Sequence, residues 1–166
     1  MLTFIQILSL ITGVWSAFTR KKFFVLLSTA IFNTSMLLCY IVTKDYVALG
    51  SSILICTRSI IYLYKEKLSR FNIIPFLFIS LHIITGIIKL QNPYQIITIV
   101  APCLICYCFW FVDNLQEIRL FNTINSILWF MYMIHCELYI SSINYILNCI
   151  IFIISYLYYK HYNINK

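Results

Sequence analysis

Charged residues are scarce in this chain. Only 10% of its 166 residues are Asp, Glu, Lys or Arg, whereas a soluble domain carries about 25%. Acidic residues are scarcest, at five against twelve basic ones, and glycine and proline occur only three times each. A soluble fold needs polar residues for its exposed surface. The composition therefore excludes an ordinary soluble domain.

Several function classes lack their usual signals. No long run alternates polar and apolar residues as transmembrane strands do. The formal charge of +7 is spread over short segments rather than one basic patch, which argues against nucleic-acid binding. No zinc spacing, phosphate loop or serine–histidine–acid grouping occurs, so nothing indicates an enzyme, a metal or a cofactor. The seven cysteines lie in apolar runs, and Cys103, Cys106 and Cys108 are more typical of small apolar filler than of a soft-metal site.

Long apolar segments make up most of the chain. A helix that spans a membrane needs about 20 apolar residues. The seven candidate spans are 2–18, 23–43, 46–64, 72–90, 94–112, 120–136 and 138–159. The last two are divided at Glu137, because one helix from 120 to 159 would be about 60 Å long, twice the hydrocarbon thickness. The sequence predicts an all-α polytopic membrane protein with seven transmembrane helices and no room for a soluble domain.

Basic residues alternate in number between successive loops. Nine follow spans one, three and five or lie in the tail, namely Arg20, Lys21, Lys22, Lys65, Lys67, Arg70, Arg119, Lys160 and Lys166. The loops after spans two, four and six hold only Lys44 and Lys89. Because positively charged loops remain in the cytoplasm, we expect the N-terminus outside and the C-terminus inside.

The second and sixth spans carry similar patterns at an offset of 92 residues. The matched pairs are Asn33 with Asn125, Leu37 with Trp129, and Tyr40 with Tyr132. Their i, i+4, i+7 spacing places each set on one helix face. We therefore predict two parallel three-helix repeats, 1–64 and 94–159, joined by a linker helix at 72–90. Parallel repeats are one known way to build a transporter.

Arg58 is the only charged residue well inside a predicted span. Arginine near the bilayer centre costs roughly 2.5–3.5 kcal/mol. Two interpretations are open: Arg58 extends toward the cytoplasmic interface, or it faces an internal cavity that receives an anionic or carbonyl-bearing solute. No carboxylate lies inside any span, which disfavours a sealed ion pair.

Asparagines and aromatic residues supply the other candidate binding residues. Amides within lipid need partners, so they either join helices together or form a midplane site for a neutral polar solute. Aromatic rings on the same face suit stacking on a ring or sugar. With Arg58, the candidate substrate-binding residues are Asn33, Tyr40, Asn125, Trp129, Tyr132, Asn144 and Asn148. His82 and His135 are interpreted as structural.

The chain resembles the bacterial inner-membrane family labelled YgjV over most of its length. The likeness rests on the basic loop Thr19–Lys22, the run from Ser51 to Arg58, the segment Lys89–Pro93 and the tryptophan-bearing span after Arg119. Asn148 stands for an asparagine of the family's last span. The three-one-three plan is also similar, more remotely, to the SWEET and PnuC transporters. The resemblance implies an inner-membrane location and no defined activity.

The leading hypothesis is a small polar-solute transporter or facilitator in the lipid bilayer of the inner membrane. The alternative is a non-transporting scaffold or regulatory protein. A transporter needs a polar cavity between the two repeats, whereas a scaffold would pack its asparagines against one another. A homo-oligomer is compatible with either.

Overall fold

The structure is a computed structural model that describes residues 2–43, 46–68, 70–88, 90, 92–137 and 139–164. These residues form α-helices and one 3-10 helix, with no strand among them. The elements are α1 (Leu2–Phe18), α2 (Lys22–Thr43), α3 (Tyr46–Leu63), α4 (Lys65–Leu68), α5 (Ile73–Ile88), η1 (Pro93–Ile96), α6 (Ile97–Phe111), α7 (Leu115–His135) and α8 (Tyr139–Ile164). The all-helical class is confirmed, and the seven long helices coincide with the seven predicted segments.

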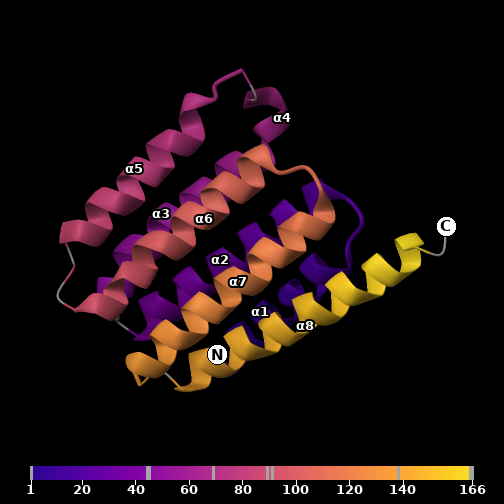
Figure 1. Cartoon of the computed structure of the whole chain (residues 1–166). Helices are drawn as coiled ribbons and strands as arrows, with labels where there is room; N and C mark the ends of the chain where they lie inside the picture. The colour runs from indigo at the N-terminus through magenta and orange to yellow at the C-terminus, as the bar shows by residue number, and fades with distance from the viewer. Residues whose placement is uncertain are drawn as a thin grey trace.

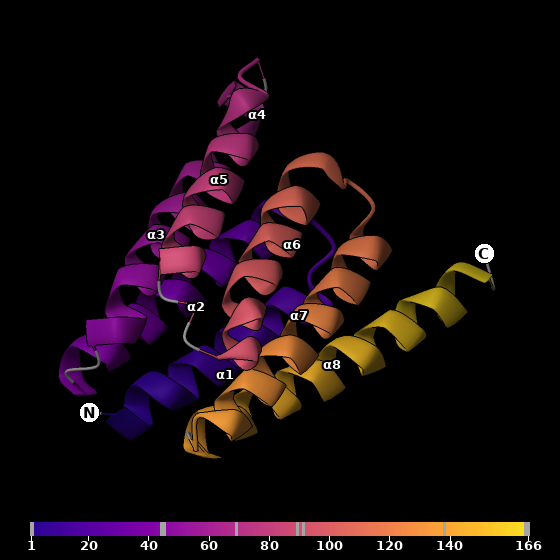
Figure 2. The same cartoon turned by 60° about the vertical axis from the view of Figure 1, so that its left-hand side comes forward.

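The helices form an antiparallel bundle of two layers. Helices α1, α2 and α3 lie behind, and α5 to α8 lie in front (Figure 1). Within each layer neighbours in sequence pack together: α2 contacts α1 and α3, and α7 contacts α6 and α8. The layers meet where α1 packs on α8 and α3 packs on α6. Helix α5 lies at the edge beside α3 and α6, so it contributes least to the interior (Figure 2).

The bundle has an apolar exterior, and its interior holds many polar side chains beside an apolar core that includes Tyr62, Phe109 and Trp110. Serine, threonine, asparagine and arginine side chains are buried, while large apolar side chains such as Ile73 and Ile88 are 72% and 78% exposed. Water-soluble folds show the opposite arrangement. Among the described residues, Pro93–Phe111 and Ser142–His161 are long and apolar enough to cross a membrane, and four other apolar helical stretches are shorter. This distribution suits a bundle surrounded by lipid.

Side-chain capping explains two helix boundaries. Asn92 begins η1 through a reciprocal pair: its Oδ1 accepts from the Gln95 backbone N at 3.2 Å, and Gln95 Oε1 accepts from the Asn92 backbone N at 3.3 Å. Asn114 Oδ1 accepts from the Gln116 backbone N at 2.9 Å and begins α7. Helix α7 therefore starts at Leu115 rather than at the predicted residue 120, because this cap extends the helix beyond the apolar run.

The predicted break at Glu137 is confirmed. Helix α7 ends at His135 and α8 begins at Tyr139. Glu137 has a φ of 59°, in the left-handed region that most residues avoid. This conformation reverses the chain between the two helices. The end of α8 at Ile164 lies beyond the predicted residue 159.

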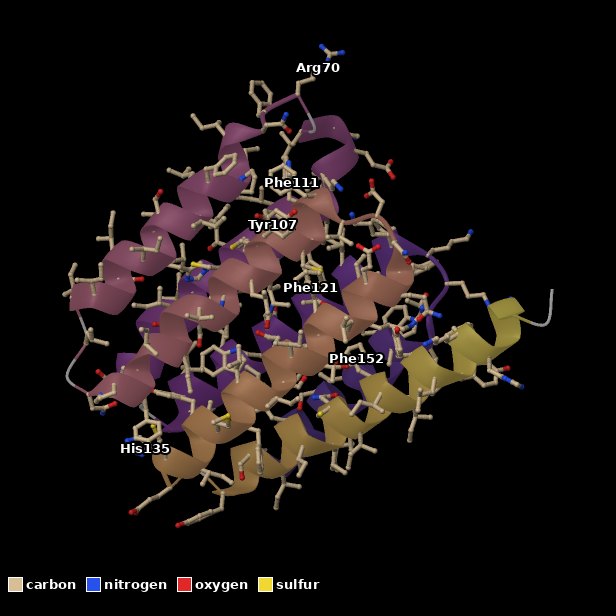
Figure 3. The ribbon with its side chains drawn as sticks, in the orientation of Figure 1. Arg70, Tyr107, Phe111, Phe121, His135 and Phe152 are labelled. Carbon is tan, nitrogen blue, oxygen red and sulfur yellow. The ribbon has the colours of Figure 1, made fainter. Side chains whose placement is uncertain are left out.

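Two polar clusters join the layers at the end of the bundle that holds the α1–α2, α3–α5 and α6–α7 connections. Lys22 and Lys65 both bind Asp113, with Nζ–Oδ1 distances of 2.6 and 3.1 Å. These hydrogen bonds lower the pKa of the Asp113 carboxyl. Lys22 begins α2, Lys65 begins α4, and Asp113 lies between α6 and α7, so the three connections at this end are linked. Figure 3 shows Arg70 at this end and His135 at the other.

Arg119 forms the second cluster. It was predicted to be a loop residue, but it lies within the first turns of α7 and is 5% exposed. Its Nε donates to the Ala17 carbonyl and its Nη2 donates to the Thr19 carbonyl, both at 2.9 Å. These carbonyls lie at the C-terminal end of α1, where a helix has no internal donors left for them. Arg119 therefore anchors α1 to α7.

Candidate functional site

A cavity lined by both polar and apolar side chains lies between the two layers. Its volume is about 110 Å³, and six of the seven long helices line it. A bound water needs roughly 10–15 Å³ on such a measure, so the cavity has room for several waters or one small solute. The lining residues are Thr12, Gly13, Ser16, Ser28, Thr29, Phe32, Asn33, Met36, Ser52, Ile55, Arg58, Pro102, Ile105, Asn122, Asn125, Ser126, Trp129, Tyr145, Asn148 and Phe152.

Arg58 borders the cavity where α3 faces α6. Its side chain is 3% exposed, and its Nη1 donates to the Pro102 carbonyl at 3.1 Å and to Cys106 Sγ at 3.4 Å. Among the described residues, no group forms a hydrogen bond with its Nε. Of the two interpretations from the sequence, this position corresponds to the internal cavity, because the guanidinium binds groups of α6 rather than extending to the end of the bundle.

Asparagine amides surround the rest of the cavity. Asn33 on α2 donates its Nδ2 to Ser59 Oγ at 2.7 Å, so this amide is held in place. Three others keep buried atoms without a partner: Nδ2 of Asn122, Oδ1 of Asn125 and Oδ1 of Asn148. A buried amide atom left unpaired costs roughly 1–3 kcal/mol. Five of the seven unpaired buried side-chain atoms among the described residues belong to residues that line this cavity.

Gly13 makes room for one of these amides. A Cβ at this position would lie 1.9 Å from Asn148 Oδ1, so any other residue would displace the amide. Asn148 is itself 4% exposed. The glycine on α1 and the asparagine on α8 therefore form one unit at the boundary between the layers.

Aromatic rings close one wall of the cavity. Trp129 stacks on Tyr145, with ring centroids 6.0 Å apart and planes at 18°. Phe32 meets the same tyrosine edge-on at 6.4 Å. One face of Trp129 is thus covered by another side chain, which leaves less of it for a solute ring than the sequence suggested.

Five of the eight predicted binding residues line the cavity: Asn33, Arg58, Asn125, Trp129 and Asn148. Two others lie outside the lining. Tyr132 packs against Trp129 with ring centroids 5.7 Å apart, and Asn144 is half-buried on α8. Tyr40 lies outside the side chains that the structure describes.

Several lining residues were not among the predicted binding residues. Asn122 and Ser126 lie on the same helix as Asn125, while Gly13 and Ser16 come from α1. Their signal was present in the sequence, since small and polar residues recur at helical spacing along 6–16 and 122–136. Spacing alone did not separate the residues that border the cavity from those that pack against a neighbouring helix.

The sequence matches the family model described as a bacterial inner membrane protein, Imp-YgjV, over residues 2–164. This chain belongs to that family. The Imp-YgjV family is one of inner membrane proteins. The exposed isoleucines and phenylalanines of the bundle therefore contact lipid. No curated protein and no solved structure matches the chain, so the expected similarity to the SWEET and PnuC transporters is not confirmed.

Proposed function

We propose that this Imp-YgjV protein is a transporter or facilitator for a small polar solute. In this proposal all seven long helices cross the membrane, and the solute passes through the cavity between the layers. The observation that carries the proposal is the cavity itself, whose lining includes an arginine and several asparagines and which lies inside a bundle whose exterior is apolar. A scaffold would instead pack these asparagines against one another and leave no cavity between them. The protein acts without chemical catalysis.

The packing of the helices supports the two-repeat plan. In each layer the middle helix packs on both outer ones, α2 on α1 and α3, and α7 on α6 and α8. A two-fold relation between the layers would turn the α1–α8 contact into an α6–α3 contact, and both contacts are present. Helix α5 would then be the linker that makes the repeats parallel.

Alternating access in this plan is a rocking of one layer against the other. The polar clusters of Asp113 and Arg119 join the layers at one end of the bundle, and they would have to open when the cavity faces that side. No cluster of His, Cys, Asp and Glu that could hold a metal ion occurs among the described residues. Facilitated diffusion without a coupling ion is the simpler form of the proposal.

Swelling of proteoliposomes tests the proposal. We expect at least one member of a panel of small polar solutes, such as glycerol, erythritol, ribose and lactate, to enter faster than into protein-free liposomes. Asn125→Leu should slow that entry, because it removes a cavity amide that would form a hydrogen bond with the solute.

Asn144→Leu is the matched control. It makes the same chemical change at a half-buried asparagine outside the cavity, so uptake should stay at the level of the original protein. If no solute enters faster, the transporter proposal fails and the scaffold alternative gains support. If a solute enters faster but both variants behave alike, the assignment of this cavity as its path fails.

A further inference from the structure

We infer that the solute is a small carboxylate that also carries a hydroxyl group, and that Arg58 binds its carboxylate. This inference rests on the proposed function, because it names the solute class of the same cavity. It starts from the charge of the lining, which includes an arginine and no aspartate or glutamate among the described residues.

The charge of Arg58 has no counter-ion within the part of the chain that the structure describes. Its Nη1 binds a neutral carbonyl and a cysteine sulfur, and its Nε binds nothing. The ion pairs among the described residues all involve Asp113, at the end of the bundle rather than in the cavity. An isolated cation in a low-dielectric interior is costly, and an anionic guest would offset that cost. A cationic solute would be repelled.

The residues that line the cavity offer both donors and acceptors. The guanidinium of Arg58 donates, the amides of Asn122, Asn125 and Asn148 can each donate and accept, and the hydroxyl of Ser16 can do both. A carboxylate accepts from donors, and guanidinium groups bind it with particular strength. The acceptors need a guest that can donate, which a hydroxyl group does and a simple fatty acid does not. A small hydroxy acid satisfies both sets.

Thermal unfolding of the detergent-purified protein tests the inference with three probes of nearly equal size. Lactate has the carboxylate and the hydroxyl, lactamide replaces the carboxylate by a neutral amide, and propionate lacks the hydroxyl. Ionic strength is matched with sodium chloride. We expect lactate to raise the unfolding midpoint at a concentration roughly tenfold below lactamide, because a hydrogen bond to a charged group is stronger than one to a neutral group. The concentration of propionate that gives the same rise in the unfolding midpoint should lie between those of lactate and lactamide.

Variants assign the effect to Arg58. Arg58→Gln should abolish the preference for lactate over lactamide, and Arg58→Lys should keep part of it because the charge remains. Arg70→Gln removes an exposed arginine outside the cavity and should change nothing. If Arg58→Gln does not fold, the comparison of the three probes on the unaltered protein still decides. Equal or stronger stabilisation by lactamide, or none by any probe, would overturn the inference.

The inference and the proposed function fail in different ways. Binding of lactate without uptake into liposomes would keep the hydroxy-acid site and reject transport. Uptake of neutral solutes without a preference for lactate in binding would keep transport and reject the hydroxy-acid site.

Discussion

At the residue scale, the cavity depends on small residues as much as on polar ones. Gly13 has no side chain to oppose the Asn148 amide, whose Oδ1 lies within 1.9 Å of where a Cβ would be. The polar atoms around the cavity therefore keep their positions only while neighbouring helices carry glycine and serine. A substitution that adds a single methyl group can change the site without changing the fold.

Gly13→Ala should lower facilitated uptake by roughly tenfold, the equivalent of one lost hydrogen bond of about 1.4 kcal/mol. Stability should change little, because alanine gains about 1 kcal/mol in a helix while crowding costs about 1–3 kcal/mol. The measurement is proteoliposome swelling with the solute that the unaltered protein admits fastest, alongside unfolding in mixed micelles of SDS.

A double-mutant comparison isolates the cause. In an Asn148→Ala background the added methyl group has no amide to displace, so Gly13→Ala should have no further effect on uptake. Gly86→Ala is the matched control, since its Cβ would meet Ile99 on α6 at 2.1 Å, away from the cavity lining. Loss of uptake in Gly86→Ala but not in Gly13→Ala would contradict this account of the glycine.

The sequence predicted the candidate residues in part. Arg58 and Asn148 lie at the cavity, as expected from a charge and an amide within apolar runs. Asn144 does not, although it is one helical turn from Asn148, and Tyr132 does not, although it is one turn from Trp129. The physical reason is that the cavity is shorter than the helices. A stripe of polar residues marks a helix face, and only part of that face borders the cavity.

At the element scale, the helices were predictable because lipid-spanning length is a strong constraint. Seven apolar runs became seven long helices, and their limits agree to within a few residues except at the start of α7 and the end of α8. The short helix α4 was not predicted. The length of an apolar run does not show where a helix begins if its first turn is polar. At α7 the Asn114 cap starts the helix within polar residues that resemble a loop.

The sequence did not predict that Arg119 anchors one helix to another. An arginine at the edge of an apolar run was expected to mark a loop, whereas it binds the last carbonyls of α1. Its guanidinium also lies 4.2 Å from the ring centroid of Tyr159, which donates to the Phe18 carbonyl at 2.8 Å. Helices α1, α7 and α8 are thus joined at one end. Such contacts join residues far apart in the sequence, so the pattern of a single helix does not predict them.

Arg119→Gln should reduce the free energy of unfolding by about 2–3 kcal/mol, because it removes charge-assisted hydrogen bonds to two buried carbonyls. Titration of the purified protein with SDS in mixed micelles measures this change. Arg70→Gln, at an exposed position of the same end, should stay within about 0.5 kcal/mol of the original protein. Equal stability of the two variants would show that Arg119 is no anchor.

At the scale of the whole molecule, the alternation of basic loops agrees with the geometry of the bundle. The loops predicted to be rich in Lys and Arg meet at one end, where Lys22, Lys65 and Asp113 form ion pairs. Helix α1 begins and α8 ends at opposite ends of the bundle (Figures 1 and 2). The side of the membrane that each end faces is still a prediction from the positive-inside rule.

Reporter fusions test that orientation. Alkaline phosphatase, active only outside the cytoplasm, should be active when fused before α1 and inactive when fused after α8. A fluorescent reporter that folds in the cytoplasm should show the opposite pattern. A cytoplasmic N-terminus would contradict the predicted topology with seven crossings.

The central claim is that the polar cavity is a path that both sides of the membrane can reach. Ser126 tests it most directly, because this serine is 4% exposed, lines the cavity and differs from cysteine by one atom. The measurement is labelling of Ser126→Cys, in a chain whose seven native cysteines are replaced by alanine, with a membrane-impermeant thiol reagent added to either side of the membrane. Ser80→Cys, on the exposed face of α5, is the control and should stay unlabelled in lipid. The account predicts that Ser126→Cys reacts from both sides; no reaction, or reaction from one side only, would contradict it.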